Sequence, residues 1–172
     1  YRMIDTASVY KNEESVGRAV ARCGVPRKDL FITSKIWNTA QRLGDVQGAF
    51  SRSLDRLKLS YVDLCLIHWP VPGCYLSTWK ELEKILESGR ALSIGVSNFD
   101  IRHLEELRKI SGIIPAVNQI ECHPLCYPSE LIEYCKAFGI QVQAYAPLAR
   151  GAYFDNDVMC VLGTKYARTP AQ

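Results

Sequence analysis

Four side chains that can carry charge or move protons lie where strand-like runs end. Asp5 follows a short strand-like run at the start of the chain, and Tyr10 lies a few residues into the loop that follows. Lys35 and His68 each end a later strand-like run. Because the carboxyl ends of parallel strands meet at one edge of a sheet, these side chains are expected to converge in one site.

The chemistry of such a set is proton transfer to an oxygen. A phenol has an ordinary pKa near 10, so Tyr10 needs help to act as an acid at neutral pH. A lysine cation beside it is expected to lower its pKa, and a carboxylate keeps that lysine charged and fixed. A histidine that donates a hydrogen bond orients a substrate carbonyl. The set can therefore protonate an oxygen while hydride arrives at the carbon.

Each residue also has an ordinary structural explanation. Asp5 can cap a helix, Lys35 can be solvated, and Tyr10 and His68 can fill the core. That explanation suits any one of them, but not four such residues at matching strand ends.

Composition and charge describe an ordinary soluble domain. The 172 residues are 48% apolar and 23% charged, with a net charge of +3 and no basic block, which gives no indication of nucleic acid or membrane binding. No run is long enough to span a membrane, and no signal peptide is recognisable. The chain begins on Tyr1, inside a strand pattern. We therefore expect a single domain over residues 1–172, truncated at both ends.

The cysteines indicate a reducing compartment. There are seven, an odd number without disulfide-like spacing, so a cytoplasmic location is expected. Cys122, His123 and Cys126 resemble part of a metal cluster, but a closed zinc site needs four ligands and no partner pair is present. We predict no metal.

Strand and helix patterns alternate along the chain. In the first predicted helix, Glu13 and Glu14 lie in the opening turn, where their negative charges interact favourably with the helix dipole. Trp37 and Asn38 are expected in a loop. Asp100 is predicted to cap a helix. The predicted helices cover about 12–22, 45–57, 79–86, 100–107, 129–138 and 158–167, and the predicted strands 1–4, 30–34, 61–67, 91–96, 115–120 and 140–144.

Six strands, each followed by a helix, predict an α/β fold with a parallel sheet. A doubly wound nucleotide-binding sheet would carry a G-x-G-x-x-G or P-loop motif, and neither is present. Polar residues at several strand ends instead favour the (β/α)8 or TIM barrel, here with six of its eight strands. Those strand-end residues are Asp5, Lys35, His68, Ser97 with Asn98, Gln119 and Tyr145. We expect the six strands in sequential order, with the first and last unpaired.

Several segments together resemble the aldo-keto reductase family, and their order resembles its microbial and protozoan members, including diketogluconate-reductase-like and prostaglandin-F-synthase-like enzymes. The segments read IDTASVY at 4–10, KNEE at 11–14, FITSKIWN at 31–38, DLCLIHWP at 63–70, IGVSNF at 94–99, VNQIE at 117–121 and AYAPL at 144–148.

The resemblance implies an NADPH-dependent reductase of small aldehydes or ketones, with NADH not excluded. It makes Tyr10 the general acid, with Lys35 and Asp5 as its partners and His68 orienting the carbonyl. Asp5, Ser97, Asn98, Gln119, Tyr145 and Leu148 match cofactor-binding positions, and Trp37, His68 and Trp69 match substrate-binding positions. Ala146 stands where many members have a cofactor-binding serine, so that contact is missing. The strand with the contacts that select NADPH is expected beyond residue 172.

The complete protein is expected to be a monomer. A second hypothesis is a non-catalytic protein on the same fold, either a cofactor sensor or a structural protein. A hydrolase or lyase on a similar barrel is disfavoured, because clustered metal ligands and paired carboxylates at strand ends are missing.

Overall fold

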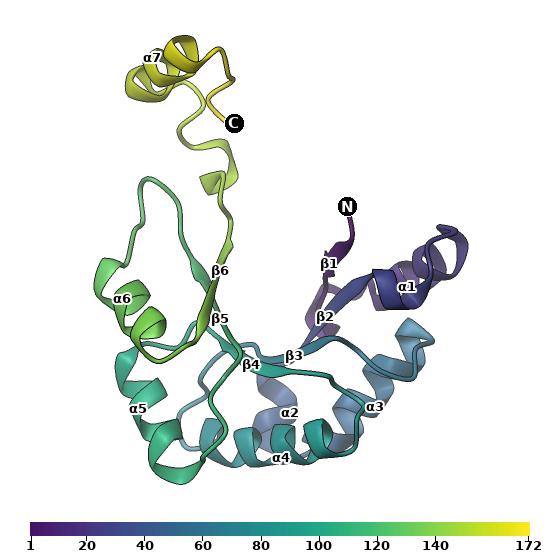
Figure 1. Cartoon of the computed structure of the whole chain (residues 1–172). Helices are drawn as coiled ribbons and strands as arrows, with labels where there is room; N and C mark the ends of the chain where they lie inside the picture. The colour runs from purple at the N-terminus through teal and green to yellow at the C-terminus, as the bar shows by residue number, and fades with distance from the viewer.

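A computed structural model describes residues 1–172, which form one curled parallel sheet with helices on its outside (Figure 1). The six strands are hydrogen-bonded in sequential order, and every pairing is parallel. The prediction of six sequential strands is therefore confirmed. The strands are β1 (Met3–Asp5), β2 (Phe31–Ile36), β3 (Leu64–Ile67), β4 (Ile94–Ser97), β5 (Val117–Glu121) and β6 (Gln141–Tyr145).

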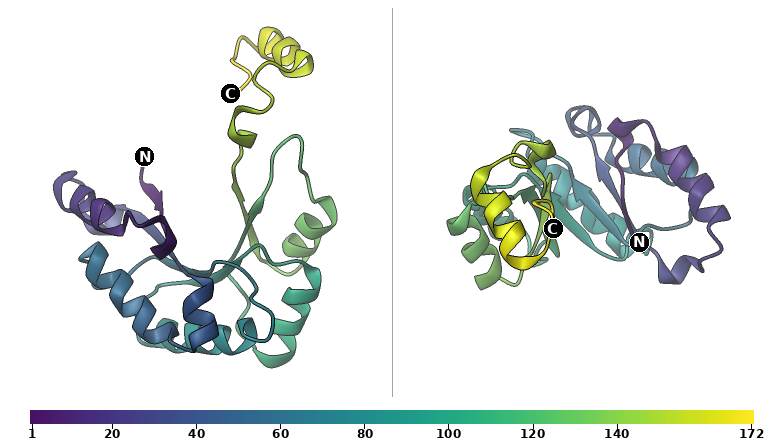
Figure 2. Two further views of the ribbon diagram at one scale, coloured as in Figure 1. Left: turned by 180° about the vertical axis from the view of Figure 1, so that it is seen from behind. Right: turned by 90° about the horizontal axis from the view of Figure 1, so that it is seen from above.

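Helices α1 and α3–α6 connect the strands and lie on the convex side of the sheet (Figures 1 and 2). Their bounds are α1 (Glu13–Arg22), α3 (Val46–Leu57), α4 (Tyr75–Glu87), α5 (Ile101–Ile110) and α6 (Ser129–Ala137). Asp100 caps α5 as predicted: its side chain accepts from the His103 amide, and His103 Nδ1 accepts from the Asp100 amide.

The hydrophobic core lies between the sheet and the outer helices. Every residue of β3 and β4 is buried, as expected for central parallel strands covered on both faces. Phe50 of α3 and Trp79 of α4 are 1% and 0% exposed, and both belong to this core. Burying side chains of this size contributes about 2–3 kcal/mol each, so the core fixes the strands that carry the strand-end residues.

The two outer strands have open edges. β1 pairs only with β2, and β6 pairs only with β5. The sheet is thus a curled half-barrel, and the expectation that no ladder joins the first strand to the last is confirmed. At the end of the chain, α7 (Asp157–Tyr166) stands away from the helices around the sheet (Figure 1). None of the helices has the length and apolar character needed to cross a membrane.

Two predictions about local structure were wrong. The segment after Trp37 is not a loop, because Asn38–Leu43 forms a short helix, α2, that ends at Gly44 in the left-handed region. The strands before His68 and Ser97 begin later than predicted, at Leu64 and Ile94. Val62 and Ala91, which precede these strands, are buried and form only an isolated bridge with each other. They are apolar because they are buried, and this apolar character led to their prediction as strand residues.

Candidate active site

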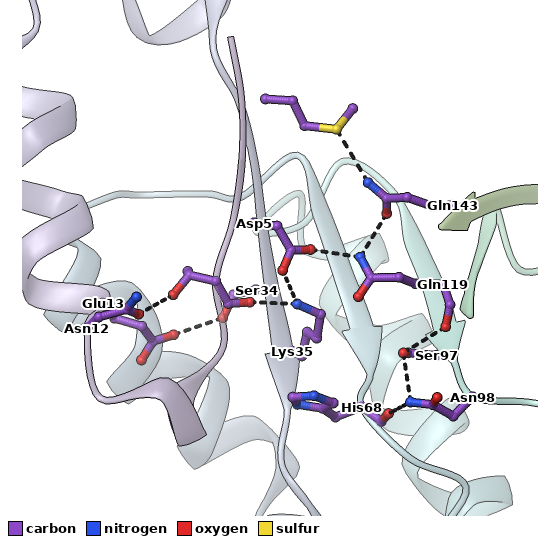
Figure 3. Close-up of polar contacts among 12 residues, drawn as sticks. Asp5, Asn12, Glu13, Ser34, Lys35, His68, Ser97, Asn98, Gln119 and Gln143 are labelled. Carbon is purple, nitrogen blue, oxygen red and sulfur yellow. Dashed lines mark hydrogen bonds and ion pairs between the residues drawn. The ribbon is translucent and has the colours of Figure 1, made fainter. Parts of the chain in front are cut away.

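The carboxyl ends of the strands bring together the four residues that were predicted to transfer protons. Asp5 ends β1, Lys35 lies next to the last residue of β2, and His68 follows β3 directly. Tyr10 ends a single 3-10 turn, η1 (Ser8–Tyr10), in the loop after β1. Figure 3 shows Asp5, Lys35 and His68 facing one another across neighbouring strands. The predicted convergence of these residues is confirmed.

An ion pair between Lys35 and Asp5 forms the centre of the site. The Lys35 side chain is completely buried, whereas that of Asp5 is 32% exposed. Lys35 Nζ also donates a 3.1 Å hydrogen bond to the Thr6 carbonyl oxygen. Burial lowers the pKa of Lys35, and the charge and hydrogen bond of Asp5 oppose that effect. The carboxylate therefore favours the lysine cation, as expected for a buried ammonium with one close partner.

Tyr10 presents its ring to two other members of the set, His68 and Lys35. Its ring centroid lies 5.7 Å from that of His68 in an edge-to-face arrangement. Lys35 Nζ lies 5.1 Å from the same centroid, over the ring. Lysine therefore contacts the phenol as a cation over an aromatic face, with its hydrogen bonds directed to Asp5 and Thr6.

The pKa of Tyr10 shifts opposite to the expected direction. Burial raises it, and the negative charge of Asp5 and the neighbouring Tyr145 raise it further. The charge of Lys35 is paired with Asp5, so it does not outweigh these effects. The expected net lowering of the pKa of Tyr10 is therefore wrong for this structure. Tyr10 carries its proton at neutral pH and can donate it.

His68 is neutral in this environment. The residue is 8% exposed, and its Nδ1 atom is buried without a hydrogen-bond partner. Burial and the charge of Lys35 lower the pKa of His68 to about 4, against the opposing charge of Asp5. A neutral imidazole has one N–H donor, which suits a hydrogen bond to a carbonyl oxygen.

This pKa predicts acid sensitivity. In the unfolded chain His68 takes up a proton near its ordinary pKa of 6.5, whereas the folded protein resists protonation until about pH 4. The unfolded state therefore binds more protons between these values, so the free energy of unfolding falls as pH falls from 6.5 to 4, by up to about 3 kcal/mol. Urea unfolding at several pH values should show a smaller slope for His68→Gln, with His103→Gln as the matched control. Equal slopes for wild type and His68→Gln would contradict the assignment.

A row of polar side chains continues the site across β4 and β5. Ser97 Oγ donates to the Gln119 carbonyl oxygen at 2.8 Å. Asn98 Nδ2 donates to the His68 carbonyl oxygen at 3.0 Å and to Ser97 Oγ at 3.1 Å. Asn98 has a φ of 62°, in the left-handed region that asparagine tolerates better than most residues. Tyr145 completes the row, because its hydroxyl donates to Asn98 Oδ1 at 2.9 Å.

The Gln119 amide is oriented by residues of two outer strands. Its Nε2 atom donates to Asp5 Oδ2 at 2.8 Å and to Gln143 Oε1 at 3.0 Å. Gln143 Nε2 in turn donates to Met3 Sδ at 3.3 Å (Figure 3). Both donors of the Gln119 amide are thus used within the protein, and its Oε1 atom makes no hydrogen bond. Gln119 can therefore accept a hydrogen bond from a ligand.

These residues surround a cavity of about 430 Å³. Sequence reasoning missed Gln143 and Arg150, which line it. Gln143 was identifiable from strand alternation, because it lies two residues before Tyr145 and faces the same side of β6. Arg150 lies in the irregular turn η3 (Ala149–Gly151), within the loop after Leu148 that the family resemblance associates with the pyrophosphate, so only the individual residue was missed. The wall consists of Asp5, Tyr10, His68, Trp69, Ser97, Asn98, Gln119, Gln143, Ala144, Tyr145 and Arg150.

Three of the predicted site residues do not line this cavity. Lys35 is buried behind Asp5, and Trp37 packs against the His68 ring with centroids 4.9 Å apart. Leu148 is 40% exposed and precedes η3. Trp69, by contrast, lines the cavity and is 43% exposed.

Comparison with known proteins identifies the family. The profile of the aldo/keto reductase family matches residues 1–159. The chain belongs to the aldo/keto reductase family. It is 49% identical over 172 residues to the glyoxal reductase of Bacillus subtilis and 47% identical over 176 residues to a methylglyoxal reductase of Yersinia pestis. The match covers all of this chain but only 62% and 63% of those relatives.

A solved structure extends the comparison. The Bombyx mori aldo-keto reductase, determined in complex with NADP, is 37% identical and superposes with a TM-score of 0.89. That match covers 99% of this chain and 63% of the silkworm protein. The half-barrel described above thus has the fold of part of an aldo/keto reductase.

The polar row suits the nicotinamide cofactor that the family implies. A carboxamide has one carbonyl acceptor and one amino donor. Both Gln119 Nε2 donors are used within the protein, so its unpartnered Oε1 atom can accept a hydrogen bond from the amino group. The Tyr145 ring provides an aromatic surface in the same cavity. The residues present therefore fit this cofactor.

Proposed function

We propose that this chain forms the catalytic part of an NADPH-dependent reductase that converts aldehyde or ketone carbonyls to alcohols. The observation that carries the proposal is that Asp5, Tyr10 and His68 line one cavity, with Lys35 buried behind them and paired with Asp5. A bound nicotinamide supplies the hydride, and the protein supplies the proton. The named relatives, which are reductases of glyoxal and methylglyoxal, support this reaction class.

In this proposal each member of the set has its own task. Tyr10 donates its proton to the carbonyl oxygen as the carbon receives hydride. The Lys35 cation, held by Asp5, stabilises the phenolate that remains. His68, neutral at pH 7, donates a hydrogen bond that orients the carbonyl oxygen beside Tyr10.

In this proposal the cofactor and the substrate would contact different residues. Asp5, Ser97, Asn98 and Gln119 would hold the carboxamide end of the cofactor, and the Tyr145 ring would contact its nicotinamide ring. Leu148 and the turn after it would hold the pyrophosphate. The substrate lies against His68 and Trp69, with Trp37 supporting the His68 ring from behind.

The proposal also covers the domain organisation, oligomeric state and location of the protein. The chain spans about 62% of its curated relatives, and its outer strands are unpaired. We infer a single domain, truncated at both ends, that belongs to an eight-stranded barrel. The complete protein is proposed to be a cytoplasmic monomer. No observation favours the non-catalytic alternative.

A cofactor-oxidation assay tests the function. The polypeptide expressed from its own gene, here called the native polypeptide, is supplied with NADPH or NADH and a panel of small aldehydes, ketones and dicarbonyls. We expect loss of absorbance at 340 nm with at least one carbonyl, and faster turnover with NADPH. NADPH binding without reduction of any carbonyl would instead favour the cofactor-sensing alternative.

A further inference from the structure

Glu13 is the only carboxylate among the buried residues, and the reaction proposed above does not use it. It is the first residue of α1 and directly follows the loop that carries Tyr10. Glu14, beside it in the same turn, is exposed. Both glutamates were predicted from the sequence to interact with the helix dipole, but Glu13 is buried and Glu14 is not, so their surroundings differ.

Two other elements hold the Glu13 carboxylate. Ser34 Oγ of β2 donates to its Oε1 at 2.8 Å. Arg56 of α3 pairs with its Oε2 through Nε at 2.8 Å and Nη2 at 2.6 Å. The buried charge is therefore paired and hydrogen-bonded, which such a charge requires to be tolerated.

Ser34 and Lys35 connect Glu13 to the active site, because they are neighbours on β2. Side chains alternate along a strand, so Ser34 faces the outer helices while Lys35 faces the barrel interior. Lys35 holds the start of the Tyr10 loop through Asp5 and the Thr6 carbonyl. Ser34 holds the end of the same loop through Glu13.

The loop between these two anchors is also closed across its base. Thr6 Oγ1 donates to Asn12 Oδ1 at 2.6 Å (Figure 3). Seven residues, from Thr6 to Asn12, are thus fixed at both ends to adjacent residues of one strand. Tyr10 lies between these anchors, with its ring centroid 5.1 Å from Lys35 Nζ and 5.7 Å from the His68 ring centroid.

Packing of α1 alone does not explain the Ser34 contact. At Gly17, α1 approaches α3 so closely that a Cβ atom would lie 2.3 Å from the Leu57 carbonyl oxygen. The Glu13–Arg56 ion pair joins the same two helices. The packing of α1 against α3 therefore rests on the close approach at Gly17 and on the ion pair. The Ser34 hydrogen bond has a different partner, because it joins α1 to β2, the strand that carries Lys35.

We propose that Glu13, through Ser34, is a positioning residue that holds Tyr10 in register with Lys35 and His68. The proposal rests on the proposed function, in which Tyr10 is the proton donor. Displacement of a reacting group by about 1 Å can cost about a hundredfold in rate, so even a small shift of this loop should be measurable.

Ser34→Ala tests the proposal in the native polypeptide, because it removes the contact to β2 and leaves the Glu13–Arg56 pair intact. We expect kcat for carbonyl reduction to fall about tenfold or more, while the dissociation constant for NADPH, measured by protein fluorescence, stays unchanged. Ser93→Ala is the matched control. It removes a serine hydroxyl that donates to the Asp63 carbonyl at 2.5 Å, before β4 begins at the opposite end of the strands.

A double-mutant cycle separates positioning from general damage. In a Tyr10→Phe background the acid is already absent, so Ser34→Ala should cause no further loss. Glu13→Gln keeps an acceptor for Ser34 but loses the charge that faces Arg56. Its kcat per folded molecule should therefore fall less than that of Ser34→Ala. Wild-type kcat in Ser34→Ala, or the same fractional loss in both backgrounds, overturns the proposal.

A structural readout remains decisive if no carbonyl is reduced. With 13Cζ-labelled tyrosine, the Tyr10 resonance is assigned by its absence in Tyr10→Phe. Ser34→Ala should move that resonance in the cofactor-free protein, and Ser93→Ala should not. A shifted resonance without any turnover would refute the proposed function but support the positioning contact, whereas an unmoved resonance would refute the contact.

Discussion

Tyr10→Phe in the native polypeptide is expected to reduce kcat for carbonyl reduction by about 10³-fold. The change removes one hydroxyl and retains the ring that contacts His68 and the Lys35 ammonium. Because burial and Asp5 raise the pKa of Tyr10, the phenol is protonated across the neutral range, and its loss removes a filled proton donor. Stopped-flow and steady-state measurements of NADPH oxidation give the loss in kcat, and fluorescence titration gives cofactor affinity, which should change little.

Tyr145→Phe provides a matched control for that experiment. It removes the same atom from a second tyrosine of the same cavity, whose hydroxyl donates to Asn98. Proton transfer should be preserved, so kcat should stay within a few-fold of wild type, while NADPH affinity weakens as Asn98 loses a partner. Wild-type turnover in Tyr10→Phe would show that another group supplies the proton.

The positions of the charged side chains at the strand ends were predictable from the sequence, because the buried part of each strand ends where the strand reaches the polar edge of the sheet. Lys35 and His68 each close a strand-like run, and parallel pairing then places them on the same edge as Asp5. The order of the strands followed from the same alternation of apolar runs and helical stripes. The α2 helix did not, because a segment of only six residues has too few turns to show a helical stripe.

The electrostatic behaviour of Tyr10 could not be read from residue types. A lysine near a phenol predicts a lowered pKa, but the sign depends on where the lysine directs its hydrogen bonds. Lys35 bonds Asp5 and Thr6 and meets only the face of the Tyr10 ring. Burial then controls the pKa of Tyr10, and only coordinates report that burial.

Contacts between distant segments were equally invisible in the sequence. Gln119 and Asp5 are 114 residues apart, yet their side chains share a hydrogen bond. Glu13 and Arg56 are 43 residues apart and form an ion pair in which only the glutamate is fully buried. Sequence spacing predicts neighbours within one helix or strand, whereas these pairs depend on how the sheet curls.

The second prediction concerns residues 1–172 expressed alone. Because their six strands curl without closing into a barrel, we expect this segment to be a poor enzyme. Both outer strands expose unpaired backbone groups, because β1 and β6 have no ladder between them. A barrel of this type closes with eight strands at a fixed tilt. Unpaired edges promote association between copies, so the segment expressed alone should be poorly soluble and show little or no turnover with NADPH and any carbonyl of the panel.

The matched comparison is a graft in which these 172 residues replace the segment they match in the Bacillus subtilis glyoxal reductase. The graft retains every site residue and gives β1 and β6 neighbours. We expect it to be monomeric by size-exclusion chromatography with light scattering, and to reduce carbonyls with NADPH.

The Lys35–Asp5 ion pair is the part of the site most dependent on closure of the barrel, because Asp5 lies on the open β1 edge and its side chain is 32% exposed. Robust turnover by the isolated segment would show instead that the contacts from β2 to β5 hold this pair in place without a closed barrel.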